Sequence, residues 1–168
     1  LDTFEQLLVS PLRPIEILAG KTLPAMFIAL ASATAMLVLA RLVLDIPFEG
    51  SLIALYLAMV VYLAANIGIG LFISSLASNQ QQAVIGLFIY MMPAVLLSGY
   101  ATPIENMPDW LQWLTGSNPI MHFIILCKGL FLKDIPPDVI FRHTWPMALI
   151  AVFTLSAGAW LFRRKTGS

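Results

Sequence analysis

Charged side chains are scarce in this sequence, and that scarcity indicates the class of protein. Asp, Glu, Lys and Arg make up 11% of its 168 residues, whereas hydrophobic residues make up 60%. A soluble domain carries about a quarter charged residues, so this chain is expected to lie in a membrane. The mean hydropathy of +0.89 supports the same class. Nine basic residues balance nine acidic ones, and the net charge therefore indicates no nucleic-acid partner.

The motifs of common catalytic and metal sites are also missing. The single cysteine, Cys127, excludes an internal disulfide and a cysteine-rich metal site. His122 and His143 lie far apart along the chain, and there is no carboxylate pair, glycine-rich phosphate loop or HExxH motif. No charged residue lies centrally in an apolar run, which disfavours a proton-coupled carrier. We therefore expect no catalytic residue, metal or cofactor in this chain, and an outside source of energy for any uphill transport.

Three stretches without any charge predict the membrane-spanning helices. They cover residues 23–40, 50–104 and 144–162. A helix needs about 20 apolar residues to cross a bilayer core about 30 Å thick, so the first and last stretches fit one span each. A polar break at residues 78–82 divides the middle stretch into two. Continuous apolar runs favour helices over barrel strands. The predicted fold is all-α, a polytopic membrane helix bundle with spans at residues 23–42, 51–77, 83–102 and 144–162.

Basic residues near both ends predict the orientation of this bundle. Arg13 and Lys21 precede the first span, and a basic tail at residues 163–168 follows the last. By the positive-inside rule both termini of the chain are cytoplasmic. The glutamine-rich turn is then cytoplasmic and residues 103–143 are external. No signal-peptide pattern opens the chain, and its first residues read like the middle of a loop, so we expect a longer protein.

The predicted external segment contains an apolar stretch that allows two interpretations. Residues 120–132 are apolar except for His122 and Lys128. A fifth span there would be short, would contain Lys128 and would leave the basic tail outside. We therefore predict a helix that re-enters the membrane or lies at its interface, and the choice between these stays open. Just before it, residues 107–114 predict a short amphipathic helix whose Trp110 and Trp113 suit the lipid headgroup level.

A polar strip runs along the second predicted span. Asn66, Gly70, Ser74 and Ser78 are spaced four residues apart and so share one face of a helix. Small residues let helix backbones approach closely, and Asn66 can form a hydrogen bond across an interface. The strip predicts either helix packing, within the subunit or between two copies, or the lining of a substrate path.

The third predicted span is interrupted near its end. Pro93 removes a backbone donor, and Ser98, Gly99 and Pro103 follow it. A membrane tolerates such a break where neighbours or water satisfy the freed carbonyls. The break predicts either a plain packing kink or a helix end beside an external vestibule.

Residues 1–22 form the predicted cytoplasmic segment before the first span. Thr3 suits a helix cap, and Phe4, Leu7 and Leu8 share one face of a short amphipathic helix that Pro11 ends. Such a helix predicts either a membrane-surface anchor or an element that docks into a groove of a soluble partner.

Three stretches carry a resemblance to a known family. The first joins TFEQLLVSP at residues 3–11 to EILAGK at residues 16–21, and the second is NQQQA at residues 79–83. The third combines LSGY at residues 97–100, Pro103, NMP at residues 106–108, WL at residues 110–111 and NP at residues 118–119. Together they resemble the ABC-2-type transporter permeases, in particular those of bacterial multidrug-type exporters. The resemblance runs nearly end to end, and its third stretch is the most specific.

The resemblance implies roles for two parts of the chain. Such permeases usually have six transmembrane helices, of which this chain would hold the last four. Residues 1–12 would include the coupling helix that docks on the ATPase, through Thr3, Phe4, Glu5, Gln6 and Leu7. Residues 98–118 would form the re-entrant helices of the outer gate. The predicted outer gate and substrate path together comprise Asn66, Gly70, Ser74, Pro93, Ser98, Gly99, Pro103, Asn106, Met107 and Pro108.

The function implied by the resemblance is that of a permease subunit of an exporter in the bacterial inner membrane. It would move a hydrophobic or amphipathic substrate, such as a drug-like molecule, a lipid or an ion. ATP and Mg²⁺ would bind a partner ATPase subunit, and a second permease subunit, identical or different, would complete the pore among membrane lipids. The alternative is a non-transporting membrane scaffold that recruits a cytoplasmic protein. A membrane-embedded enzyme is disfavoured because polar clusters at bilayer depth are missing.

Overall fold

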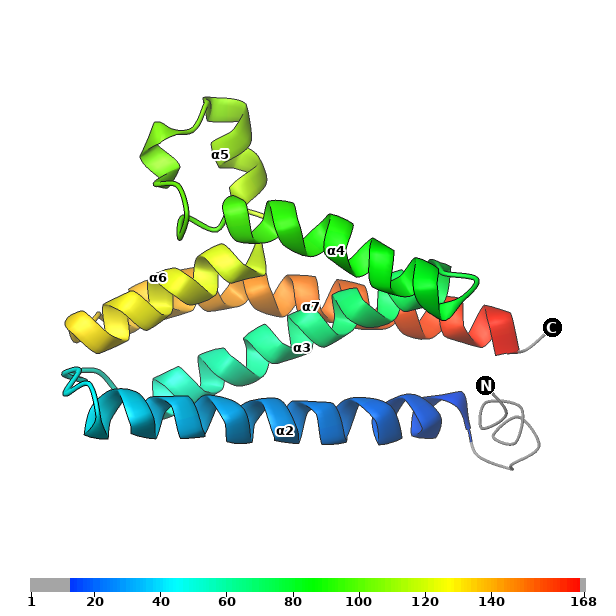
Figure 1. Ribbon diagram of the computed structural model, residues 1–168, viewed down its shortest axis with the longest axis horizontal. Coiled ribbons are helices and arrows are strands. Elements are labelled where there is room, and N and C mark those ends of the chain that lie inside the picture. Colours follow the sequence, from blue (N-terminus) through cyan, green and yellow to red (C-terminus); the bar gives the residue numbers. More distant parts are fainter. Residues whose placement is uncertain (1–12, 167–168) are drawn as a thin grey trace.

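The computed structural model describes residues 13–166, which fold into six α-helices and one 3-10 helix (Figure 1). The described part of the chain contains no strand, in agreement with the predicted all-α class. The predicted coupling helix at residues 1–12 lies outside the described residues. The helices are α2 (Pro14–Leu42), α3 (Leu52–Leu76), α4 (Gln80–Leu96), η1 (Ile104–Asn106), α5 (Asp109–Thr115), α6 (Pro119–Leu132) and α7 (Pro137–Thr166).

Three of the described helices are long and apolar enough to cross a membrane. They are α2 over Ile15–Leu42, α3 over Leu52–Leu76 and α7 over Pro137–Lys165. These helices coincide with three of the four predicted spans. Two of them start earlier than predicted, because α2 begins at Pro14 rather than near residue 23 and α7 begins at Pro137 rather than near residue 144. The first turns of α7 therefore belong to the stretch that was predicted to be an external connection.

The fourth predicted span corresponds to α4, which is shorter than the other three. The helix ends at Leu96, so residues 97–102 of the predicted span are not helical. Pro93 lies inside its last turn, and Gly99 adopts a φ of 81°, which a continuing helix does not allow. Its 17 residues extend about 26 Å, which is short of a hydrocarbon core about 30 Å thick. A complete crossing by α4 therefore stays a prediction.

The glutamine-rich break forms the turn between α3 and α4. The Asn79 side chain accepts a hydrogen bond from the Gln82 amide at 2.8 Å, and the Gln82 side chain accepts one from the Ser78 amide at 2.9 Å. The first bond satisfies an amide in the first turn of α4 that lacks a helical partner, and the second holds the residue before the cap. Ser78 was predicted to lie on the α3 strip. It lies beyond α3 instead, since that helix ends at Leu76.

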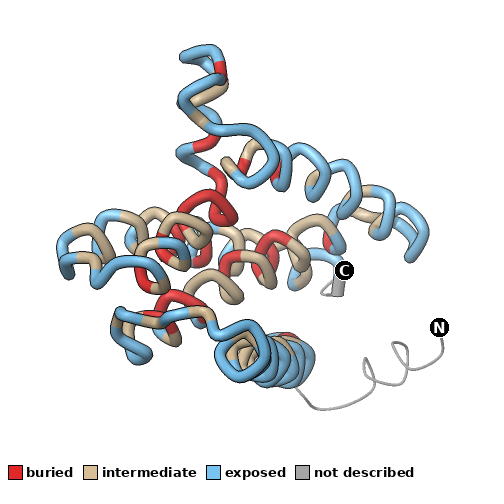
Figure 2. The backbone as a smooth tube through the Cα atoms, turned by 60° about the vertical axis from the view of Figure 1, so that its left-hand side comes forward, coloured by how far each residue is buried: buried red, intermediate tan, exposed pale blue. Residues whose placement is uncertain are grey.

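Helices α3 and α7 form the centre of the bundle and approach closely at two glycines. A Cβ on Gly68 would overlap the Thr154 hydroxyl and lie 2.9 Å from the Leu155 amide nitrogen. On the opposite helix, a Cβ on Gly158 would lie 3.2 Å from the Leu71 Cβ. The buried residues gather where α3, α6 and α7 meet (Figure 2). Packing in this part of the bundle therefore depends on small residues that let the backbones approach.

The turns and helix ends define two ends of the bundle (Figure 1). The start of α2, the α3–α4 turn and the end of α7 lie at one end, where the Lys165 ammonium donates to the Ala77 carbonyl at 2.8 Å. The α2–α3 and α6–α7 connections lie at the other, where the Gly50 amide donates to the Leu130 carbonyl at 2.9 Å. Residues 14 and 166 thus share one end of the bundle, as the predicted topology requires.

Candidate functional site

The predicted polar strip lies beside the α3–α7 contact rather than within it. Asn66 is half-buried and donates to the Tyr62 carbonyl of its own helix at 2.9 Å. A Cβ on Gly70 would meet no atom within 4 Å, and Ser74 is exposed. The close approach to α7 is made by Gly68, two residues from Gly70. The strip therefore does not serve packing against α7, and its alternatives of a substrate path or a contact with a second copy stay predictions.

Apart from Pro93, the predicted outer-gate residues lie between the end of α4 and the start of α5. Pro93 lies within α4, Pro103 precedes η1 and Pro108 precedes α5. Ser98 is 1% exposed and donates to the Val95 carbonyl at 2.6 Å, which closes the end of α4. Gly99 supplies the left-handed residue of this turn.

The remaining gate residues lie in the hairpin between η1 and α5. Met107 is buried, and its carbonyl accepts a hydrogen bond from the Gln112 side chain at 2.8 Å. Asn106 is exposed at the end of η1. Trp110 and Trp113 of α5 are both exposed, and the amphipathic character of this helix stays a prediction. Six of the predicted residues thus lie in one compact hairpin that projects from the bundle (Figure 1), namely Ser98, Gly99, Pro103, Asn106, Met107 and Pro108, whereas Pro93 lies within α4.

Asn118 joins this hairpin to α4, a role that the sequence patterns did not indicate. Its side-chain carbonyl accepts from the Ile120 amide at 3.1 Å and caps α6. Its side-chain amide donates to the Ala94 carbonyl at 2.6 Å, in the last turn of α4 where helical donors run out. A cavity of about 310 Å³ borders this joint, lined by Ile89, Tyr90, Pro93, Ala94, Leu97, Leu114, Ser117 and Asn118. Within the described residues the Tyr90 hydroxyl is buried without a hydrogen-bond partner.

The two histidines, which the sequence separates by 21 positions, are in direct contact. The Nδ1 atoms of His122 and His143 lie 3.0 Å apart, and His122 Nε2 lies 2.8 Å from the Gly116 carbonyl oxygen. The two histidines thus lie far apart along the chain but adjacent in the fold. The loop between α6 and α7 reverses the chain, so the first turn of α6 meets the second turn of α7. Within the described residues no group of three or more metal-binding side chains forms around them.

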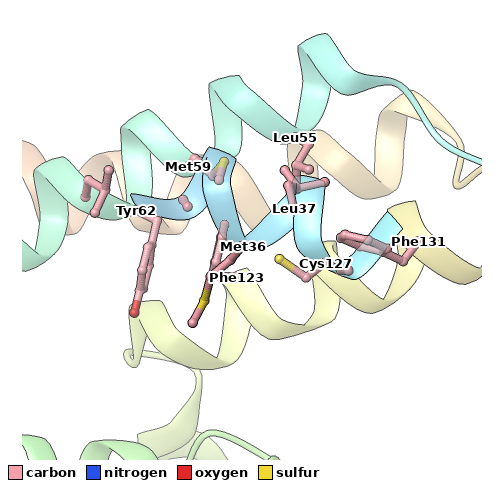
Figure 3. A pocket seen from close by; sticks show the side chains of 11 residues that line it. Met36, Leu37, Leu55, Met59, Tyr62, Phe123, Cys127 and Phe131 are labelled. Carbon is pink, nitrogen blue, oxygen red and sulfur yellow. The ribbon is translucent and has the colours of Figure 1, made fainter. Parts of the chain in front are cut away.

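An apolar cavity of about 420 Å³ lies between α2, α3 and α6 (Figure 3). The rings of Tyr62 and Phe123 stack at its edge, with centroids 4.2 Å apart and planes within 7°. No lining side chain is charged, and the volume lies in the range of about 300–1,000 Å³ that small-molecule pockets occupy. The lining residues are Ala33, Met36, Leu37, Ala40, Leu55, Met59, Tyr62, Leu63, Phe123, Cys127 and Phe131. The sequence patterns predicted none of them as site residues.

The profile of one protein family, described as ABC-2 family transporter protein, matches residues 2–160. The chain belongs to this family. It is 50% identical over 163 residues to the probable multidrug ABC transporter permease YbhR of Escherichia coli K12. That alignment covers 97% of this chain and 44% of YbhR, so the chain spans less than half the length of this relative.

Two other Escherichia coli K12 proteins are more distant relatives. The probable multidrug ABC transporter permease YbhS is 29% identical over 165 residues, covering 97% of this chain and 43% of YbhS. The inner membrane transport permease YhhJ is 28% identical over 148 residues, covering 88% of this chain and 38% of YhhJ. No solved structure matches the chain significantly. The family and the three long apolar helices identify the chain as a multi-pass membrane protein.

Proposed function

We propose that this chain is the membrane-spanning part of an ATP-driven exporter of hydrophobic or amphipathic molecules in the bacterial inner membrane. The observation that carries the proposal is the family match over residues 2–160. The chain contains no glycine-rich phosphate loop of its own, so ATP and Mg²⁺ would bind a partner ATPase subunit. A second permease subunit would complete the pore, and the likeness to both YbhR and YbhS supports either an identical or a related partner.

The apolar cavity between α2, α3 and α6 supports the proposed substrate class. Its walls are formed by aliphatic, methionine and aromatic side chains, and burial of apolar surface is the main driving force available there. An ion placed in such a cavity would lose its hydration without gaining a counter-charge. Uncharged or amphipathic molecules therefore suit this wall better than free ions. The Asn66–Gly70–Ser74 strip and the hairpin after α4 remain the proposed outer parts of the path.

Coupling to the ATPase is proposed for residues 1–12, through Thr3, Phe4, Glu5, Gln6 and Leu7. Closure of the nucleotide-bound ATPase would push this segment, and α2 would transmit the movement because it begins directly afterwards at Pro14. ATP-driven movement of the bundle would then release the substrate past residues 98–107. This mechanism requires no chemistry from the permease itself.

The test is to co-express the full permease with its ATPase and reconstitute the complex into lipid vesicles. Phe4→Ala and Glu5→Arg are expected to insert normally and to hydrolyse ATP without substrate export. A conservative Glu5→Gln variant, which keeps the side chain's length, serves as the control for Glu5→Arg. Normal export by both Phe4→Ala and Glu5→Arg would contradict the coupling role. Failure of any ATPase to copurify would favour the membrane-scaffold alternative.

A further inference from the structure

The contact between His122 and His143 connects three elements of the fold. His122 lies in the first turn of α6 and is 6% exposed, whereas His143 lies in α7 and is half-buried. Gly116, whose carbonyl contacts the other nitrogen of His122, follows the last turn of α5. These contacts therefore tie the hairpin that contains α5 to α7 through one imidazole ring. Both histidines of the chain take part.

The Gly116 contact determines which nitrogens carry protons. A carbonyl oxygen only accepts hydrogen bonds, so His122 Nε2 must carry a proton at 2.8 Å from it. In its neutral form His122 then presents a lone pair at Nδ1. His143 must supply the proton of the 3.0 Å contact from its own Nδ1. The neutral pair is thus a chain of two hydrogen bonds in one direction, from His143 through His122 to Gly116.

These donor and acceptor assignments limit how many further protons the two histidines can bind while they stay in contact. A first added proton goes to His143 Nε2 and leaves both hydrogen bonds intact, because that nitrogen is not part of the chain. A second proton would have to bind His122 Nδ1, where it would face the Nδ1 proton of His143. The contact would then consist of two donors and two positive charges, and it cannot persist.

The neighbouring elements provide little charge to compensate for a second proton. Arg142 lies next to His143 on α7 and adds a third positive charge to the region. Helices α3 and α4 contribute no acidic side chain along their whole lengths. The other titratable groups of the packed elements are Tyr56 and Tyr62 of α3, Tyr90 of α4, Asp109 of α5, Cys127 and Lys128 of α6, and Asp138, Arg163, Arg164 and Lys165 of α7, the last three at the opposite end of that helix. Asp109, Lys128 and Asp138 are exposed, so water screens their charges.

We propose that His122 and His143 form an acid-sensitive latch between the α5 hairpin and α7. The latch is closed when the pair carries no added proton or one, and it opens when both imidazoles are protonated. Opening releases α7 from His122, while the hairpin keeps its bond to the His122 ring. This proposal concerns the fold alone and holds whichever substrate the protein moves.

The first measurement is nitrogen NMR of the full permease in lipid bilayers, with only its histidines labelled by ¹⁵N. The chain's two histidines are distinguished by a His143→Asn variant. At about pH 7.5 one ring is expected to carry its proton at Nε2 and the other at Nδ1. Two rings that both carry the proton at Nε2 would overturn the proposal, because the Nδ1 atoms could then not be joined by a hydrogen bond.

The second measurement is the distance between spin labels on the two elements. Labels at Trp113→Cys of α5 and Phe141→Cys of α7 replace exposed side chains, in a Cys127→Ser background. The distance distribution is expected to be narrow at about pH 7.5 and to broaden at the acid pH at which the NMR spectrum shows both rings protonated. A distribution that stays narrow after double protonation would overturn the proposal.

Two variants separate the latch from a general effect of acid. His143→Leu removes the donor and is expected to give the broad distribution at both pH values. His143→Asn retains an amide near the position of Nδ1 that can donate or accept, so its distribution should stay narrow at both. Acid broadening that persists in His143→Asn would overturn the latch. The NMR measurement and the distance measurement require neither ATP nor transport, so their outcomes are independent of the proposed exporter function.

Discussion

Gly68 and Gly70 lie two residues apart on α3 and have opposite surroundings. A Cβ on Gly68 would overlap Thr154 of α7, whereas a Cβ on Gly70 would meet no atom within 4 Å. The polar strip predicted from the spacing of Asn66, Gly70 and Ser74 is thus distinct from the residue that brings α3 and α7 together. The spacing of these residues predicted a face of small side chains on α3. Only the position of α7 determined that Gly68, rather than Gly70, is the glycine required for close packing of the two helices.

Alanine substitutions at Gly68 and Gly70 are expected to show that only Gly68 is required for packing of α3 against α7. Gly68→Ala should lower the free energy of unfolding by about 1–3 kcal/mol, because the added methyl group overpacks the α3–α7 contact. Gly70→Ala makes the same chemical change in open space and should be neutral or raise stability by roughly 0.5–1 kcal/mol through helix propensity. Thermal unfolding of the detergent-solubilised permease measures both. Equal melting temperatures for the two variants would show that the close contact is absent.

At the scale of elements, the end of α4 shows how a helix in this bundle is terminated. Pro93, the Ser98 hydroxyl bond and the left-handed Gly99 stop the helix, and Asn118 then satisfies the Ala94 carbonyl from another element. The sequence predicted an interruption here. It did not predict that residues 97–102 leave the helix or that Asn118 joins α4 to α6, because that bond connects positions 24 residues apart.

Replacing the amide of Asn118 should loosen this joint. Asn118→Asp keeps an acceptor for the Ile120 amide but replaces the donor to Ala94 by an oxygen, leaving a buried carbonyl unpaired at a cost of about 1–3 kcal/mol. Hydrogen exchange of residues 90–98, followed by mass spectrometry, should become faster in this variant. Ser117→Asp introduces the same charge at the adjacent exposed position and should leave the exchange unchanged. Unaltered protection in Asn118→Asp would refute the joint.

At the scale of the whole molecule, the apolar cavity exists only because three helices meet. Phe123, Cys127 and Phe131 recur every four residues on α6, and similar apolar faces run along α2 and α3. Each face is readable in the sequence as helical periodicity. Because every span in this chain is apolar on several sides, periodicity could not show which faces enclose a cavity and which contact lipid or another subunit.

Filling the cavity is expected to block the proposed transport. Ala33→Phe places a ring in the cavity wall, whereas Ala35→Phe adds the same ring on an exposed face of α2. In vesicles containing the full permease and its ATPase, Ala33→Phe should lose most export of a lipophilic dye and most dye-stimulated ATP hydrolysis. Ala35→Phe should retain both activities. Full export by Ala33→Phe would show that the substrate does not enter this cavity.

The sequence by itself determined the membrane class, the all-α fold and the positions of α2, α3 and α7. Each of these follows from local composition, since a long charge-free run without strand alternation satisfies its backbone in lipid as a helix. The resemblance carried by three short stretches also predicted the family, which the match over residues 2–160 confirms.

Only the tertiary structure decided the contacts between segments that are distant in the chain. The return of α7 along α6 placed His143 against His122, and the convergence of α2, α3 and α6 formed the apolar cavity. The 21 positions between the two histidines gave no sign of this contact, because separation along the chain does not fix distance in the fold. Helix periodicity specifies which side chains share a face, but the partner of that face is chosen by packing of the whole bundle.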